Sequence, residues 1–206
     1  MTQHVDYWFD PICPWAWMTS RWMTEIEGIR DVEVTWHPFS LGILNEGNEL
    51  DAGYREHIEK SWGPARVAMA VRELHGQESV KPFYDAVGTA IHPERTEEED
   101  DAVRYREAIL RGLREAGLPE DLVEYAGKTD YDEALRASNQ RGLDLVGDDV
   151  GVPIIAIEGT AFFGPVMSPA PKGEEAGRVW DGALALASYE GFFELKRSRT
   201  RGPQFD

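Results

Sequence analysis

The sequence predicts an α/β fold in which a βαβ half and a ββα half are separated by a large all-α insertion. Two observations carry this prediction. Strand-like apolar runs occur only near the two ends of the 206-residue chain, where helix-like segments accompany them. The stretch from 51 to 147 shows helical patterns and no comparable strand. We therefore expect residues 1–50 and 148–206 to form one domain and residues 51–147 to form a helical insertion domain.

The N-terminal half begins with a strand expected at residues 5–9, which is apolar on both faces as a central strand would be. A helix is expected over residues 14–26, because proline suits the first helical position, and Gly28 is the expected stop. One face of this helix carries an apolar stripe, made of Trp15, Met18, Trp22, Ile26 and Ile29. Residues 32–36 alternate between apolar and polar types, which predicts a second strand and a right-handed βαβ unit.

The insertion is expected to contain separate helices, including residues 54–62, 64–76, 80–91 and 131–141. Gly63-Pro64 separates the first two, because proline disrupts a helix interior. The acidic run at 97–101 favours a helix N-terminus. Asp130 with Glu133 resembles a capping box for the last helix of the insertion.

The residue pattern of the C-terminal half predicts a hairpin followed by a helix. Residues 152–158 and 161–164 are apolar runs joined by the turn Gly159-Thr160, as in an antiparallel hairpin. Residues 173–188 follow with helical spacing.

The composition excludes several classes of protein. No apolar run approaches the roughly 18 residues of a membrane helix, and no signal peptide opens the chain. The single cysteine, Cys13, excludes an intramolecular disulfide and fits a reducing compartment, so we expect a cytoplasmic protein. The net charge of −17 disfavours nucleic acid as a partner. The one dense basic stretch, residues 196–201, is expected to be a solvated tail on an acidic surface.

Metal and nucleotide sites have no sequence signal. The five histidines share no ligand spacing, and one cysteine gives no zinc signature. Gly142, Gly147 and Gly151 fit no nucleotide-binding fingerprint. We therefore expect no metal, flavin or nucleotide cofactor, and no membrane partner. The seven Trp and eight Phe fit either a homodimer interface or a large core.

Chemistry is expected in residues 9–17, FDPICPWAW, where a strand turns into a helix. Pro14 at the first helical position places Cys13 at the N-cap. The helix dipole and the free N–H groups there lower a thiol pKa and favour the nucleophilic thiolate. The alternative is a small buried apolar residue, which is the common fate of a free cysteine. The order Cys-Pro-aromatic between strand and helix favours the nucleophile.

The order of strand, Cys-Pro-x-x at a helix start, helical insertion and Val152-Pro153 before a hairpin resembles the thioredoxin fold in its DsbA-like form. Residues 9–17 resemble the active-site segment of the actinobacterial mycothiol-dependent DsbA-like nitroreductases, which read Cys-Pro-Trp-Cys there. The resemblance covers essentially the whole chain. Its other segments are residues 40–46, 54–56, 146–153, 162–165 and 192–197.

This resemblance implies a thiol-dependent oxidoreductase with mycothiol as co-substrate and a small aromatic or disulfide substrate. It also implies that Pro153 is a cis-proline beside the Cys13 thiol. The substrate-binding positions that it implies are Trp15, Asn45, Tyr54, Val152 and Pro153. Trp15 offers a flat face for stacking, while Asn45 and Tyr54 supply hydrogen bonds. From the residues alone, a packed indole, a turn residue and a helix tyrosine are the alternatives.

His92 follows an apolar helix face and precedes Pro93. It either shapes the pocket, serves as a general acid, or is simply a histidine in a turn.

Ala16 departs from the family's pattern, which has a second cysteine three residues after the first. Without this resolving thiol, thiol–disulfide exchange still permits a route with one cysteine. We expect Cys13 to form a mixed disulfide with a low-molecular-weight thiol, and a second thiol molecule to release Cys13 from it. Either a natural monothiol variant or a substitution that traps a mixed disulfide would give this sequence. Two other functions stay open: a thiol transferase or isomerase like the kappa-class glutathione transferases, and a redox-inactive binding module.

Overall fold

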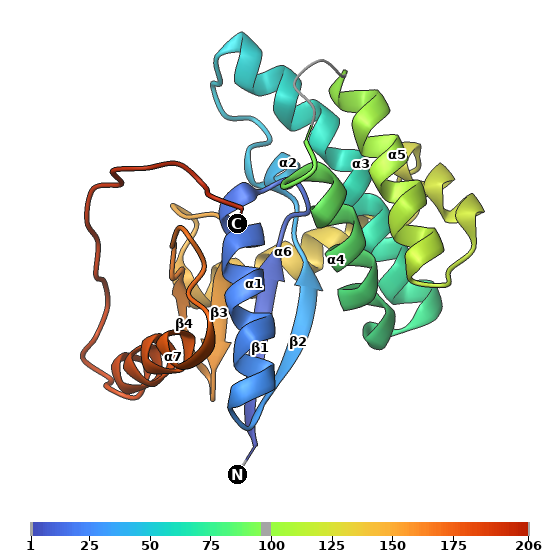
Figure 1. Ribbon diagram of the computed structural model, residues 1–206. Coiled ribbons are helices and arrows are strands. Elements are labelled where there is room, and N and C mark those ends of the chain that lie inside the picture. The colour runs from blue at the N-terminus through green and yellow to red at the C-terminus, as the bar shows by residue number, and fades with distance from the viewer. Residues whose placement is uncertain (1, 96–99, 206) are drawn as a thin grey trace.

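The structure is a computed structural model that describes residues 2–95 and 100–205. Its elements follow the expected order of βαβ, a helical block and ββα (Figure 1). In chain order they are β1 (Gln3–Phe9), α1 (Pro14–Ile29), β2 (Val32–Pro38), α2 (Leu41–Leu44), α3 (Ala52–His75), η1 (Gln77–Ser79), α4 (Val80–Ile91), α5 (Asp101–Glu115), η2 (Glu120–Gly127), α6 (Asp132–Val146), β3 (Ile154–Ile157), β4 (Thr160–Phe163) and α7 (Gly173–Ala187). The α/β class is confirmed.

The four strands form one sheet in the order β2-β1-β3-β4. β1 pairs in parallel with β2 and antiparallel with β3, so that Tyr7 lies opposite both Trp36 and Ile155. β3 and β4 form the expected antiparallel hairpin, with Ile157 opposite Thr160. Its turn is Glu158-Gly159, so the expected turn at Gly159-Thr160 is wrong by one residue. β1 is therefore a central strand, which explains why its residues are apolar on both faces.

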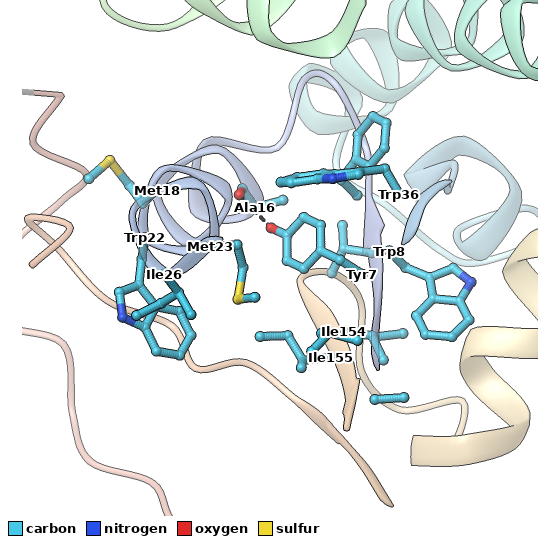
Figure 2. Packing of buried hydrophobic residues seen from close by; sticks show 14 of the residues in the cluster. Tyr7, Trp8, Ala16, Met18, Trp22, Met23, Ile26, Trp36, Ile154 and Ile155 are labelled. Carbon is cyan, nitrogen blue, oxygen red and sulfur yellow. Dashed lines mark hydrogen bonds between the residues drawn. The ribbon is translucent and has the colours of Figure 1, made fainter. Parts of the chain in front are cut away.

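Successive residues of β1 contact helices on opposite faces of the sheet. The Tyr7 hydroxyl donates a hydrogen bond of 2.6 Å to the carbonyl oxygen of Ala16 in α1 (Figure 2). The indole N–H of Trp8 donates one of 3.1 Å to the carbonyl oxygen of Ser138 in α6. α7 packs beside α1, where the rings of Trp22 and Trp180 lie 5.9 Å apart. Helices thus cover both faces of the sheet and bury its core.

Two breaks expected within helices are wrong. α3 runs without interruption through Pro64, and α1 runs through Gly28 to Ile29. A proline inside a helix costs about 3 kcal/mol. The turns of α3 that follow Pro64 bury Val67, Ala68 and Val71 in the core of the helical block, and this burial offsets the cost.

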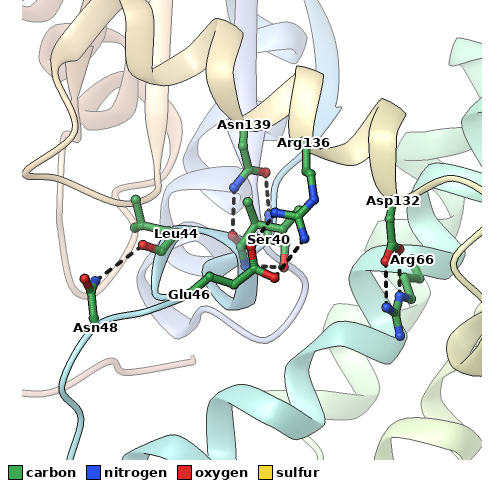
Figure 3. A network of polar contacts seen from close by, with 9 residues as sticks. Ser40, Leu44, Glu46, Asn48, Arg66, Asp132, Arg136 and Asn139 are labelled. Atoms are coloured by element: carbon green, nitrogen blue, oxygen red, sulfur yellow. Dashed lines mark hydrogen bonds and ion pairs between the residues drawn. The ribbon is translucent and has the colours of Figure 1, made fainter.

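The start of α6 also differs from the prediction. Its N-cap is Tyr131, and no side chain caps the helix there, so the capping box expected from Asp130 and Glu133 is wrong. The first turn is instead held by Asp132, whose carboxylate accepts two hydrogen bonds from Arg66 of α3 (Figure 3). Residues 97–99 of the acidic run lie outside the described residues. α5 begins directly after them, with Asp100 accepting a hydrogen bond from the Ala102 N–H.

The expected division into two domains stays a prediction, but α6 bears on where its boundary falls. Gly142 of α6 lies so close to Trp8 and Ile154 of the sheet that an added Cβ would stand 3.1–3.3 Å from their side chains. The Trp8 bond to Ser138 lies on the same helix. This packing favours an insertion that ends before Asp132 rather than at residue 147.

Candidate active site around Cys13

Cys13 occupies the N-cap of α1, as its sequence position predicts. Its backbone N–H donates to the carbonyl oxygen of Asp10 (3.0 Å), which closes the turn after β1. Its own carbonyl oxygen accepts from the Trp17 N–H (2.9 Å), which opens the helix. Pro14 fills the first helical position, where its missing N–H leaves no bond unmade. The local sequence thus fixes where the sulfur lies.

The Cys13 sulfur meets a second stretch of chain, 139 residues away. The thiol donates to the carbonyl oxygen of Val152 at 3.6 Å, and the Ala16 N–H donates to the sulfur at 3.5 Å. The peptide bond between Val152 and Pro153 is cis, and both residues are buried. The structure therefore brings the Cys-Pro segment and the Val-Pro segment together in one site.

The pKa of the Cys13 thiol departs from the prediction in direction. Burial raises it to about 12, and the negative charge of Asp10 adds to the rise. The N–H groups of Ala16 and Trp15 at the helix start lower it, as expected, but their effect is smaller. Only 6% of Cys13 is exposed, so the lost hydration of a thiolate outweighs the helix terminus. The expectation of a depressed pKa is wrong for this buried thiol.

Asp10 is a site residue that the sequence analysis missed. Its carboxylate is fully buried and accepts hydrogen bonds from the N–H groups of Ile12 (3.0 Å) and Leu41 (2.7 Å). Burial raises its pKa to about 7, and these two hydrogen bonds oppose the rise. The sequence signal is an aspartate three residues before the cysteine, directly after the strand expected at residues 5–9.

The Asp10 partner Leu41 is held in place by α6. Asn139 accepts a hydrogen bond from the Ser40 N–H (2.9 Å) and donates one to the Ser40 carbonyl oxygen (2.8 Å) (Figure 3). Both bonds are buried. Asn139 thereby fixes the backbone just before Leu41, and through Asp10 it supports the turn that carries Cys13.

Three of the five implied substrate-binding residues, Trp15, Asn45 and Tyr54, lie in different environments. Trp15 is half-buried next to Cys13 in the first turn of α1. Asn45 caps α2, and its amide donates to the Leu41 carbonyl oxygen at 2.8 Å. Tyr54 is 41% exposed on α3. Its pKa is raised, chiefly by partial burial and further by the charges of Cys13 and Asp10.

His92 is a buried structural neighbour of the active-site turn. Its Nε2 lies 2.9 Å from the carbonyl oxygen of Pro11, which can only accept, so Nε2 carries the proton. The ring stacks on Trp17 at 5.7 Å. Burial lowers the His92 pKa to about 3, so the ring is neutral at physiological pH. Of the functions weighed for His92, the geometry fits pocket shaping and does not fit a general acid.

Ala16 is fully buried below the thiol, and its N–H is the one that reaches the Cys13 sulfur. Position 16 is thus adjacent to the sulfur, where a second thiol would lie within reach of the first.

Within residues 2–95 and 100–205, no group of three or more His, Cys, Asp or Glu side chains is arranged to hold a metal ion. In the same part of the chain, no helix has the length and apolar character needed to cross a membrane.

Solved structures with the same arrangement include DsbA proteins. The probable DsbA oxidoreductase SCO1869 from Streptomyces coelicolor matches with a TM-score of 0.56 and 18% identity, over 96% of this chain and 94% of that one. DsbA from Chlamydia trachomatis matches with a TM-score of 0.57 and 12% identity, over 91% and 89%. At these identities the likeness shows the fold alone, which is the thioredoxin-like fold in its DsbA form.

Sequence comparison extends the likeness to whole chains. The protein Rv2286c of Mycobacterium tuberculosis is 29% identical over 199 residues, which span 95% of this chain and 82% of that protein. A sequence model of the Rv2466c-like family, described as mycothiol-dependent nitroreductase Rv2466c, matches residues 12–197. Fold and family together support a thiol oxidoreductase. The match includes Cys13, the helical block and the Val152-Pro153 segment, and the chain belongs to the Rv2466c-like family.

Proposed function

We propose that this protein is a monothiol oxidoreductase in which Cys13 exchanges with the disulfide of a low-molecular-weight thiol, mycothiol. The observation that carries the proposal is the position of the Cys13 sulfur. It lies at the start of α1 and 3.6 Å from the carbonyl oxygen of Val152, at the meeting point of two segments distant in sequence. The family name supports mycothiol as the thiol partner.

The exchange conserves atoms and electrons with a single cysteine. The Cys13 thiolate attacks one sulfur of the oxidised thiol, a new S–S bond forms, and the second sulfur leaves as a thiolate. A further molecule of reduced thiol then attacks the mixed disulfide and releases Cys13. Because Ala16 has no sulfur, this external thiol does the work of a resolving cysteine.

Nitroaromatic reduction uses the same mixed disulfide. A nitro group accepts two electrons and two protons from the Cys13 thiol and one mycothiol thiol, giving a nitroso group and one water. The two sulfurs are oxidised to the mixed disulfide, which reduced mycothiol resolves as above. We place this chemistry in the cytoplasm, where reducing conditions keep a lone cysteine as a thiol.

Each implied site residue has a physical task in this proposal. Pro14 leaves the first helical turn open, so that the backbone N–H of Ala16 points at the sulfur. Trp15 provides the aromatic surface at the rim. The Val152 carbonyl oxygen accepts a hydrogen bond from the Cys13 thiol, and this bond is lost when a thiol partner binds. Asn45 and Tyr54 border the substrate on the side of α2 and α3.

The test is to incubate the protein with oxidised mycothiol and measure its intact mass. One mycothiol attached to Cys13 is expected, and its removal by reduced mycothiol should restore the original mass. Cys13→Ser is the matched control and should form no adduct. Absence of an adduct on native Cys13 after prolonged incubation would sink the proposal.

A redox-inactive binding module is the second candidate, and the buried thiol favours it. With a pKa of about 12, little thiolate is present at neutral pH. This candidate predicts that a nitroaromatic compound binds while thiol and nitro compound are not consumed, and that binding survives Cys13→Ser. Turnover that Cys13→Ser abolishes would exclude it.

A further inference from the structure

The C-terminal tail, residues 188–205, has no regular secondary structure but returns to the active-site end of α1 (Figure 1). Ser168 holds its last turn: its hydroxyl donates to the Gly202 carbonyl oxygen and accepts from the Gln204 N–H, both at 2.9 Å. The same loop is tied to α1, since the Thr19 hydroxyl donates to the Pro165 carbonyl oxygen at 2.8 Å. The end of the tail is therefore attached to α1 through this loop.

Phe205 docks the tail beside the active-site turn. Its ring lies 5.6 Å from that of His92, which contacts Pro11 just before Cys13. Phe205 is half-buried and forms one wall of a cavity of about 310 Å³ that Trp17 and Met18 of α1 also line. These contacts place the preceding basic residues of the tail near the start of α1.

Arg199 lies on the face of Trp15, with its guanidinium carbon 5.0 Å from the ring centroid. Arg199 is exposed to solvent, as expected for residues 196–201, but it contacts an aromatic ring and not an acidic surface. Among residues 2–95 and 100–205, no carboxylate pairs with its guanidinium. Arg199 is thus a cation, held over the residue that borders Cys13, with its hydrogen-bond donors unused by acidic side chains.

We propose that Arg199 is a specificity-determining residue that selects aromatic substrates carrying a carboxylate. The ring of such a substrate would contact the rest of Trp15, and its carboxylate would accept hydrogen bonds from the Arg199 guanidinium. The surface of a protein with net charge −17 repels anions, so a local cation at the site favours their approach. The proposal rests on the proposed function in one respect: Cys13 must be the group that reacts.

The first experiment measures how fast Cys13 reacts with two aromatic disulfides, the dianionic dithiobis(nitrobenzoate) and the neutral dithiodipyridine. In each case the thiolate attacks one sulfur, the S–S bond breaks and an aryl thiolate leaves, which is followed by its absorbance. Arg199→Met keeps a long side chain against Trp15 and removes the charge. Arg197→Met, a neighbour on the same tail, changes the net charge equally and is the matched control.

For Arg199→Met we expect the rate with the anionic reagent to fall about threefold, as an exposed ion pair predicts, with the neutral reagent unaffected. High salt should reduce the wild-type preference in the same direction. Arg197→Met should keep the wild-type ratio of the two rates. Equal ratios in the two variants would overturn the proposal.

A binding measurement separates this proposal from the reactivity of Cys13. In the Cys13→Ser background, dialysis gives the dissociation constants of nitrobenzoate and of uncharged nitrobenzamide. We expect Arg199→Met to weaken nitrobenzoate about threefold and to leave nitrobenzamide unchanged. If Cys13 proves inert towards both disulfides, the proposed function fails, and this ratio still decides whether Arg199 recognises the anion.

Discussion

The sulfur of Cys13 lies 3.6 Å from the carbonyl oxygen of Val152, and both residues are almost completely buried. Only the protonated thiol can donate to a carbonyl, so this contact stabilises the thiol and disfavours the thiolate. Burial acts in the same direction. The reactivity of Cys13 therefore depends on how far its hydrogen bond to Val152 and its burial are relieved.

The pH dependence of Cys13 alkylation should report this environment. With a pKa near 12, the thiolate fraction and hence the iodoacetamide rate should rise about tenfold per pH unit from neutral pH to beyond pH 10. For the chain unfolded in urea, the alkylation rate should instead level off at a pH just above the ordinary thiol pKa of about 8.5. A plateau below pH 9 in the folded protein would contradict the buried, carbonyl-bonded thiol.

Asp10→Asn should make Cys13 more reactive. Burial is the main reason for the high thiol pKa, but the Asp10 charge adds to it. Removing that charge should lower the thiol pKa and speed alkylation about threefold or more near pH 8. Asp6→Asn is the control, since the Asp6 carboxylate pairs with His37 on the neighbouring strand. Equal rates in the two variants would show that Asp10 does not act on the sulfur.

Asp10 should also make stability depend on pH. Its pKa is raised from 3.8 to about 7, so the folded protein holds a proton that the unfolded chain has already lost. The resulting stabilisation is complete below about pH 4 and is lost as the pH rises to about 7, a change of about 4 kcal/mol. Urea unfolding across this range measures it. Asp10→Asn should lose this component, and an unchanged pH profile in the variant would contradict the assignment.

Ala16→Cys should create a disulfide with Cys13. Position 16 is adjacent to the thiol, since its N–H reaches the sulfur at 3.5 Å. Under mild oxidation the intact mass should fall by two hydrogens, and a mixed disulfide on Cys13 should release its mycothiol without a second thiol molecule. Ala68→Cys, at an equally buried position in the helical block, should show neither change. An oxidised variant with two free thiols would contradict the geometry.

Gly88→Ala should destabilise the protein and disturb the site. A Cβ at Gly88 of α4 would lie 2.2 Å from the ring of Trp17, which is buried against His92. The ring must move, at a cost of about 1–3 kcal/mol in the free energy of unfolding. Gly182→Ala in α7 is the control, because nothing lies within 4 Å of its added Cβ. That change should instead stabilise by about 0.5–1 kcal/mol. Urea unfolding of both variants decides the comparison.

Much of the fold could be predicted because its signals are local. The apolar runs, the hairpin turn at Gly159 and the position of Pro14 specify strands, hairpin and N-cap through neighbouring residues. The break expected at Pro64 failed because burial of the following turns outweighs a local helix penalty. Local preference predicts an element well only where packing does not oppose it.

The candidate site also has features that the sequence predicts and features that depend on the fold. Cys13 at a helix start was evident from the sequence, while the importance of Asp10 was not, since its burial depends on Leu41 and on the support of Asn139 in α6. The direction of the thiol pKa was also mispredicted. A helix terminus can be recognised in a sequence, but the desolvation that outweighs it arises from the surrounding fold.

The sequence by itself determined the fold class, the position of the single cysteine, Cys13, and the alanine three residues after it. Only the tertiary structure decided that Val152 accepts from the thiol and that Arg199 covers Trp15. The physical reason is that burial and charge at a site are sums over atoms brought together from distant parts of the chain. Those sums, and not the local pattern, set the pKa of Cys13 and the charge next to Trp15.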